Sequence, residues 1–495
     1  MNTLFLGLDY GVVSSLKNKL DIQKVYTVGL KKDFNLLEDS SFLDFGIHYS
    51  HSQMKANIYP ALEKELLPLD EIILSKLAEC EQIFLGMADR LFIGASYRKR
   101  YRLYTDHVKF WYNFFLQKKI SLIFAANVPH EGYDYVLYMV ATAIFKIRFI
   151  GAYVLPIRPG LITLGYLWHN LNRHSSTQKH FSNFKISSSS ALISYYDHYG
   201  DKKTFEPFHR KKNTKQIFFD SLKSNAKRDT RKIIKAFKEK TILRKIINRL
   251  TFSNPDRIQN ASDFYFENKG KVDKFYNKNS EGISGIKNKK FIYFPLHYQP
   301  EASTSPLGGF YSSQELVCDA VSHFMPEDCI LAVKEHPRGS KAPNIRNIDF
   351  YKRILSCKNT ILIKKNEDPN FLLNNSFLNI SITGSSIMES ILLSKPVMMF
   401  GSRFFENAPG VFRINSNEDI SSAFNQLKTL SEGDLNKDKV LKYFSKIQGC
   451  VFNYVVSRED MMLSDGVTLE ESNANYINAV IHLLHELDKK TNHDS

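Results

Sequence analysis

Short apolar runs alternate with amphipathic stretches along two separate parts of the chain. In residues 1–170, Thr3–Leu8 and Ser121–Ala126 have the continuous apolar character of buried strands, whereas Tyr101–Lys118 has the spacing of an aromatic-rich amphipathic helix. This alternation predicts a parallel sheet with crossover helices. The other elements predicted here are strands at Lys24–Gly29, Gln82–Met87 and Arg148–Val154 and helices at Tyr59–Cys80 and Tyr135–Phe145.

The same alternation resumes at residue 291 and predicts a second Rossmann-like domain. The tail Asn473–Leu487 has apolar residues at helical spacing, so we expect a helix that packs back on the body. The predicted strands are Phe291–Phe294, Cys329–Val333, Thr360–Ile363, Leu378–Ile382 and Val397–Phe400, and the helices are Gln314–Phe324, Phe350–Cys357, Pro369–Asn374 and Ile387–Leu393.

Residues 171–290 lose this alternation and are predicted to be a basic helical or linker segment. Within them, residues 221–250 carry eleven Lys or Arg and two Asp or Glu, with apolar residues at roughly helical spacing. This basic segment is interpreted either as a solvated helix face or as a contact for an anionic membrane surface or lipid-linked acceptor. We therefore divide the chain into domains at 1–170 and 291–465, the segment 171–290 between them, and a C-terminal helix in 466–495.

The charge of the chain favours anionic partners. The net charge is +16 and the pI is near 9.3, although a generally lysine-rich surface would give the same values. The cysteines lack C-x-x-C spacing, which is unlike a zinc site or a disulfide framework. Residues 1–10 lack the pattern of a signal peptide, and no apolar run reaches the ~20 residues of a membrane span. We expect a cytoplasmic protein, at most peripheral at the inner membrane, and no nucleic-acid partner.

Polar residues follow the predicted strands of the second domain, where open α/β sheets bind ligands. The imidazole of His336, before Pro337, can donate to a phosphate oxygen, with Lys334 in support. Ser386 with Glu389 three residues later predicts a capping box, which leaves amides and hydroxyls for an anion. The nucleotide-binding candidates are His336, Pro337, Lys334, Thr383, Gly384, Ser385 and Ser386.

Two further turns supply candidates for substrate binding and catalysis. The polar turn with Gln299, Pro300, Glu301 and Ser303 follows an apolar strand and is assigned to substrate binding, although a plain loop would look the same. In the first domain, Pro129–Gly132 follows the buried strand at 121–126. Its Glu131 is the candidate general base or nucleophile, with His130 tuning it. The simpler alternative is a helix start in which Glu131 serves only the helix dipole.

Three phrases of the second domain resemble a known group. They are Phe294–Thr304, Lys334–Pro337 and Thr383–Glu389, and they are similar to the Gln-Pro, His-Pro and Ser-Ser motifs of bacterial capsule polysaccharide biosynthesis proteins, including β-Kdo transferases, and of CMP-sialic acid transferases. The resemblance implies a GT-B fold with two Rossmann-like domains facing a cleft, a nucleotide sugar held by the second, and no metal or other cofactor.

This resemblance favours a glycosyltransferase that moves a CMP-activated ulosonic acid, Kdo-like or sialic-acid-like, to a surface glycan or glycolipid. His336, Ser385 and Ser386 would stabilise the leaving phosphate. Two alternatives stay open. One is a nucleotide-sugar 2-epimerase or a CDP-glycerol-type polymer transferase, and the other is a non-enzymatic partner in glycan assembly or export that works through the basic segment.

Overall fold

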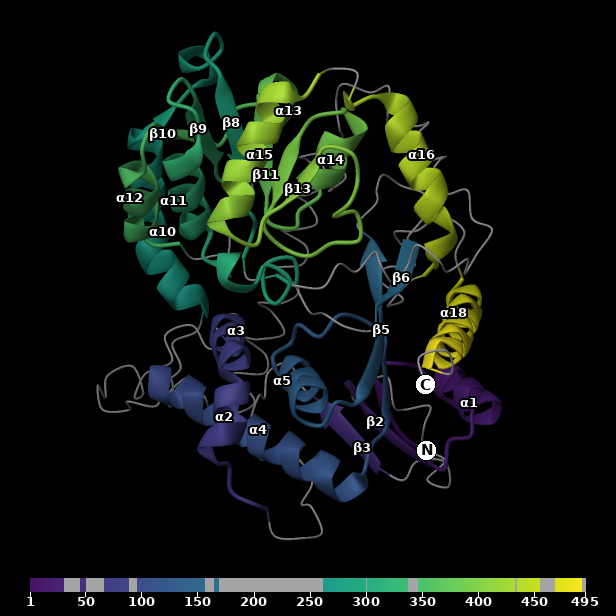
Figure 1. Cartoon of the computed structure of the whole chain (residues 1–495). Helices are drawn as coiled ribbons and strands as arrows, with labels where there is room; N and C mark the ends of the chain where they lie inside the picture. Colours follow the sequence, from purple (N-terminus) through teal and green to yellow (C-terminus); the bar gives the residue numbers. More distant parts are fainter. Residues whose placement is uncertain are drawn as a thin grey trace, which may run out of the picture.

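Two seven-stranded sheets organise the protein, one in each of two lobes (Figure 1). The computed structural model describes residues 1–30, 45–49, 66–88, 96–155, 164–168, 261–299, 301–336, 346–431, 434–454 and 468–491. The basic segment at 221–250, Pro300 and Pro337 lie outside these residues, so their predicted roles are not addressed by the structure.

The sheet of the first lobe has the order β14-β6-β5-β4-β1-β2-β3. From β3 to β5 every pairing is parallel, whereas β6 and β14 add to the edge in antiparallel fashion. Its central run, β3-β2-β1-β4-β5, matches the first five strands of the doubly wound Rossmann order. The strands are β1 (Asn2–Leu6), β2 (Lys24–Leu30), β3 (Phe45–Tyr49), β4 (Leu122–Ala125), β5 (Arg148–Leu155), β6 (Leu164–Trp168) and β14 (Phe452–Asn453).

Three helices of the first lobe, α1, α2 and α4, begin at side-chain caps. The Asp9 carboxylate accepts the Val12 N–H at 3.1 Å and starts α1, and Ser96 caps α4 in the same way. The predicted strand Gln82–Met87 is wrong, because these residues belong to α3. The helices are α1 (Tyr10–Lys19), α2 (Glu71–Lys76), α3 (Ala78–Ala88), α4 (Tyr97–Lys118) and α5 (Tyr133–Met139), which continues as a π-helix at Val140–Ile144.

The sheet of the second lobe has the order β13-β12-β11-β8-β9-β10-β7 and is parallel throughout. From β10 to β13 this is the complete doubly wound order, in which the first strand, β8, lies beside the fourth, β11. The strands are β7 (Ser280–Glu281), β8 (Phe291–Pro295), β9 (Ile330–Lys334), β10 (Thr360–Ile363), β11 (Leu378–Ser381), β12 (Val397–Met399) and β13 (Val411–Arg413).

The helices predicted for this lobe are confirmed, and the structure adds others. One of these is α10, which ends two residues before β7, so part of the predicted linker belongs to the second lobe. The helices are α10 (Ala261–Lys278), α11 (Gln314–Phe324), α12 (Ile348–Ser356), α13 (Pro369–Asn375), α14 (Ser386–Leu392), α15 (Asn417–Thr429) and α16 (Lys437–Ile447).

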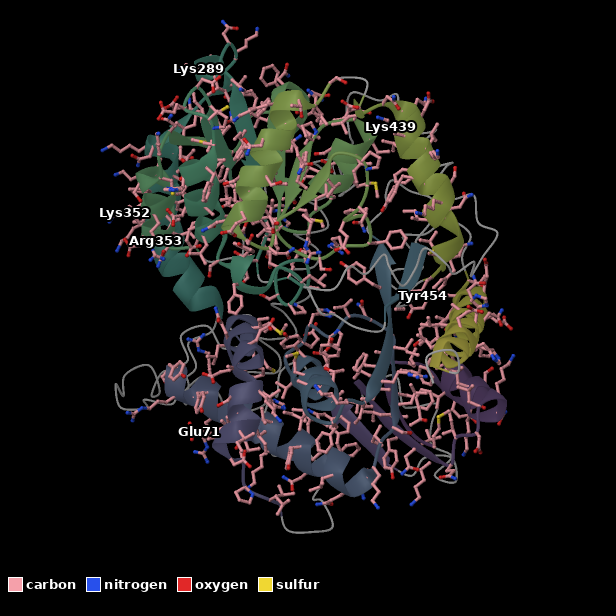
Figure 2. The ribbon with its side chains drawn as sticks, viewed as in Figure 1. Glu71, Lys289, Lys352, Arg353, Lys439 and Tyr454 are labelled. Carbon is pink, nitrogen blue, oxygen red and sulfur yellow. The ribbon has the colours of Figure 1, made fainter. Side chains whose placement is uncertain are left out.

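After α16 the chain returns to the first lobe. The Tyr454 hydroxyl donates to the Ala126 carbonyl at 2.6 Å, and Figure 2 places Tyr454 between the lobes. The last helix, α18 (Leu469–Thr491), lies against α1, and its Tyr476 hydroxyl donates to the Ala125 carbonyl at 3.1 Å. The described part of the tail therefore lies against the first lobe, while the predicted division into domains stays a prediction.

The carboxyl ends of the two sheets are joined. Arg403, just after β12, donates to the hydroxyl of Tyr153, near the end of β5. A single apolar cluster also runs from the first sheet to Leu307 and Ile387 of the second lobe. The architecture is therefore α/β and GT-B-like, with two Rossmann-like sheets whose carboxyl edges meet. None of the described helices has the length and apolar character needed to cross a bilayer.

Candidate functional site

Two loops meet where β8 and β11 lie side by side, which is the switch point of the second sheet. His297 follows β8 and is buried. Its Nε2 accepts the Ile382 backbone N–H at 3.1 Å and lies 3.1 Å from the Ser381 hydroxyl. Because Nε2 accepts a hydrogen bond, the ring proton of a neutral imidazole is on Nδ1. The Gly384 N–H also donates to the Ser381 hydroxyl, so one serine connects both loops.

His297 stays neutral because its surroundings oppose a positive charge. Burial, and then the charges of Arg403, His336 and Arg346, lower its pKa to about 3. The same observation shows that three positive or protonatable groups surround this switch point. His297 stands in the sequence phrase that we singled out, but it was not among the predicted site residues.

The loop after β11 carries four of the nucleotide-binding candidates. Thr383 is buried, and its hydroxyl donates to the Ser303 carbonyl. Gly384 packs so closely that a Cβ there would lie 2.8 Å from the His297 ring. Ser385 and Ser386, in contrast, are partly exposed at the start of α14.

The predicted capping box at Ser386 and Glu389 is wrong. Ser385, not Ser386, is the N-cap of α14, and its side chain makes no capping hydrogen bond. Burial raises the pKa of Glu389, which a hydrogen bond with Ser385 partly offsets. Glu389 therefore interacts with the side chain of the N-cap residue Ser385, and no capping box is formed.

A buried network positions the end of β9. The Glu335 carboxylate, beside His336, accepts from the Arg346 guanidinium and the Tyr351 hydroxyl. Arg346 Nη2 also donates to the His297 carbonyl at 2.6 Å. Arg346 thereby ties the loop after β9 to the loop after β8, and its charge is balanced by Glu335.

The two basic candidates on β9 differ in exposure. Lys334 is buried, and desolvation lowers its pKa. The charges of Glu335, Asp368 and Glu367 act in the opposite direction but do not cancel this effect. His336 is partly exposed and lies beside Tyr298, with ring centroids 5.7 Å apart. Of the two, His336 is placed to meet a ligand, while Lys334 can act only through its charge.

The polar turn after β8 is mostly committed to structure. The Gln299 side chain donates to the Ser312 carbonyl and accepts from Gln314 at 2.6 Å. Ser303 contributes its carbonyl to Thr383, and Glu301 is exposed. Gln299 therefore holds the turn in shape, and its predicted contact with substrate stays a prediction.

A second cluster lies at the switch point of the first sheet, between β1 and β4. His130 Nδ1 lies 2.6 Å from the Val128 carbonyl, which makes it the donor, and Nε2 lies 3.2 Å from Glu131 Oε1. Beneath them the buried Asp134 carboxylate accepts the backbone N–H groups of His130 at 3.0 Å and Glu131 at 2.7 Å. Asp134 shapes this turn and was not predicted, although its position in the first turn of α5 is a sequence signal for such a role.

The charges of this cluster act on one another. Burial alone would lower the pKa of His130, but the hydrogen bond that the imidazole donates to Glu131 and the charges of Asp134 and Glu131 outweigh it and raise the pKa. Burial raises the pKa of Asp134 to about 6, against the stabilising effect of His130. The turn therefore holds a histidine and two carboxyl groups, and the pKa values of His130 and Asp134 are both raised.

Among the described residues, no group of three or more His, Cys, Asp or Glu side chains is arranged to hold a metal ion. Cationic or protonatable side chains lie at the carboxyl edge of the second sheet. They are Lys334, His336, Arg346 and Arg403.

Comparison with known proteins gives only weak similarities. No family model and no curated protein matches the sequence. A UDP-GlcNAc 2-epimerase from Methanocaldococcus jannaschii is 10% identical, with a TM-score of 0.26 over 90% of this chain and 98% of that one. The β-Kdo 2,7 transferase KpsC from Thermosulfurimonas dismutans is 10% identical, with a TM-score of 0.26 over 68% and 85%.

A glycosyltransferase from Rickettsia africae is 12% identical, with a TM-score of 0.23 over 98% of this chain and 97% of that one. Similarities at these TM-scores carry no argument about chemistry. The architecture rests on the strand orders of the two sheets, and the site rests on its side chains.

Proposed function

We propose that the protein is a nucleotide-sugar-dependent glycosyltransferase that holds its donor at the carboxyl edge of the second sheet. The observation that carries the proposal is the switch point between β8 and β11. There a neutral buried histidine, a tightly packed Gly384 turn with two partly exposed serines, and several cationic side chains lie together. A doubly wound sheet binds nucleotides at this position, and the cations match a phosphate.

The leaving phosphate would be stabilised by donors fixed before it arrives. His336 and the hydroxyls of Ser385 and Ser386 are partly exposed, and they lie in the two loops that flank the loop of His297. Charge that develops on the phosphate as the glycosidic bond breaks would be met by these groups. In this proposal the protein's own cations balance the phosphate, without a metal.

The turn after β4 would act on the acceptor. Glu131 would remove the proton of the acceptor hydroxyl as that oxygen attacks the anomeric carbon, and the bonding electrons would leave with the nucleotide. If the reaction retains configuration, the Glu131 carboxylate would first displace the nucleotide from the anomeric carbon, and the acceptor oxygen would then displace Glu131, which takes up the hydroxyl proton. His130, 3.2 Å from Glu131, would keep that carboxylate ionised.

The finer assignments rest on the sequence resemblance. They are a CMP-linked ulosonic acid as donor, a glycan or lipid-linked acceptor, and a cytoplasmic location with the basic segment at an anionic membrane surface. The net charge of +16 supports an anionic donor and surface but selects neither.

The test is release of nucleotide from CMP-, CDP-, UDP- and GDP-sugars by the purified protein, with and without glycan acceptors. We expect turnover of one donor class and a loss of about 100-fold or more in His336→Ala. His323→Ala is the matched control, because His323 is exposed on α11. Isotope exchange at the sugar C2 without acceptor would indicate an epimerase instead, and no turnover of any donor would contradict the proposal.

A further inference from the structure

Arg403 is a buried cation that forms no ion pair with any of the described residues. The residue is 4% exposed, and among the described residues no carboxylate lies within ion-pair distance of its guanidinium. Its neighbours in the protein are neutral. Nε donates to the Thr383 carbonyl at 2.8 Å, Nη1 donates to the Tyr153 hydroxyl, and the guanidinium lies 4.7 Å from the centre of the Tyr153 ring.

Two other arginines of this lobe have carboxylate partners, whereas the buried Lys334 has no ion pair among the described residues and is influenced by the charges of Glu335, Asp368 and Glu367. Arg346 is paired with Glu335, and Arg413 with Glu406. Lys352 and Arg353, labelled in Figure 2, are in contrast exposed residues of α12. Burying a charge without a counter-charge is unfavourable, so proteins pair such groups or bring them together with a charged ligand.

The surroundings of Arg403 indicate which kind of group would balance its charge. Its Nε contact is the carbonyl of Thr383, in the same turn as Ser385, and its charge is felt by His297. The carboxyl edge of β11 and β12 is therefore positive at the point where Ser385 and Ser386 present hydroxyls. The planar guanidinium also carries N–H groups that can donate two parallel hydrogen bonds to an oxyanion.

We infer that Arg403 binds an oxyanion of the donor, and that this contact is what balances its buried charge. The inference rests on the proposed function and deepens it, because it names a residue that binds the charged group of the donor. The oxyanion is the nucleotide phosphate or, for an acidic sugar, its carboxylate. Through Tyr153 the same guanidinium reaches β5, so an anion bound there also touches the junction of the two lobes.

The test measures binding of three probes by calorimetry. CMP and UDP carry only phosphate, and free N-acetylneuraminic acid carries only a carboxylate. Arg403→Gln should weaken the probe that supplies the oxyanion by about tenfold or more, because a charge-assisted hydrogen bond is lost. Arg403→Lys should keep part of that affinity, since the charge remains and the two parallel hydrogen bonds are lost.

Two variants separate anion binding from a purely structural bridge. Tyr153→Phe removes the bond to the first lobe but keeps the charge of Arg403, and Arg413→Gln leaves Glu406 buried without its partner. Both should keep probe affinity within about threefold, and Arg413→Gln should melt at lower temperature. Without ligand, Arg403→Gln should melt at the wild-type temperature or above it, because it removes an unbalanced charge.

Unchanged affinity for all three probes in Arg403→Gln would overturn the inference, as would an equal loss in Tyr153→Phe. The result is separable from the proposed function. If no sugar nucleotide is turned over but CMP or UDP binding depends on Arg403, the inference stands and the transferase does not. If a donor is turned over and Arg403→Gln behaves as wild type, the transferase stands and the inference about Arg403 does not.

Discussion

Close packing at single residues shapes the candidate site. A Cβ on Gly308 would lie 2.7 Å from Ile382, one on Gly384 2.8 Å from the His297 ring, and one on Gly401 2.2 Å from Thr383. These glycines let the loops after β8, β11 and β12 approach one another. The sequence shows the glycines, but it does not show which side chain each one makes room for.

Gly384→Ala should displace the His297 ring and lower the free energy of unfolding by about 1–3 kcal/mol, as overpacking does. Nucleotide binding should weaken with it, since the same turn carries Ser385. Gly270→Ala is the matched control, because a Cβ on Gly270 in α10 meets no atom within 4 Å. Urea unfolding of both variants is the measurement. Equal stability of Gly384→Ala and the wild type would show that this turn has room to adjust.

His107 makes the protein sensitive to acid. It is buried in α4, and burial lowers its pKa to about 3 from an ordinary value of 6.5. Below pH 6.5 the unfolded chain binds a proton on His107 that the folded protein does not bind until about pH 3. Stability therefore falls as pH falls through this window, by at most about 1.4 kcal/mol per pH unit for this residue.

Replacing His107 should make that dependence shallower. His107→Gln should lower the free energy of unfolding at pH 7 and reduce its loss between pH 6.5 and 4.5. Because His297 and Asp134 titrate in both proteins, the difference between variant and wild type reports on His107. His323→Gln, at an exposed position, should leave the slope unchanged. Unfolding free energies at several pH values decide the matter. A slope in His107→Gln as steep as in wild type would mean that His107 titrates normally.

At the scale of elements, sequence periodicity predicted the second lobe well. Residues Gln314–Phe324 and Thr360–Ile363 have the predicted type and bounds, because each buried strand is an unbroken apolar run beside a clearly amphipathic helix. The prediction of a strand at Gln82–Met87 failed because Ile83, Phe84 and Leu85 form a short apolar run, which is compatible with a strand or with a helix. In α3, Cys80, Ile83, Phe84 and Met87 are buried at helical spacing, and this was the signal to follow.

The candidate site was predictable only in part. The turns at 297–304, 334–337, 383–386 and 129–132 could be identified because polar residues follow apolar strands in the sequence. The roles of Asp134, Arg346 and Arg403 depend on contacts with backbone and side chains of other segments. Arg346, for example, reaches the His297 carbonyl across 49 positions of sequence, and no local pattern encodes that contact.

Helix α18 is expected to be part of the core of the first lobe. Leu483 is 1% exposed there, so Leu483→Ala should lower the free energy of unfolding by about 2–5 kcal/mol. His485→Ala, at an exposed position of the same helix, should change it by no more than about 0.5 kcal/mol. Urea unfolding followed by circular dichroism measures both. Equal effects would show that α18 contributes little to the stability of the lobe.

At the scale of the molecule, the joined carboxyl edges of the two sheets carry side chains of opposite charge. The first sheet offers Glu131 and Asp134 with His130, and the second offers the cations around His297. Arg403 and Tyr153 join the two carboxyl edges, and the return of the chain through Tyr454 supports that junction. Such an arrangement suits a reaction in which an anionic donor and a hydroxyl acceptor approach from different lobes.

The basic segment at 221–250 should bring the whole protein to anionic membranes. Vesicles with phosphatidylglycerol should bind the full chain and release it as salt is raised, because the attraction is electrostatic. A variant with Lys232, Lys235 and Lys238 changed to Gln should bind more weakly, whereas Lys287, Lys289 and Lys290 changed to Gln should not. Flotation assays measure this, and equal binding of the two variants would argue for a solvated helix face.

The most direct measurement of the central claim is a crystal structure of the protein with a bound nucleotide. The account predicts the phosphate at the carboxyl edge of the second sheet, within hydrogen-bond distance of Ser385 and Arg403 and beside His336. A nucleotide bound against the first sheet, or away from the switch point between β8 and β11, would contradict it.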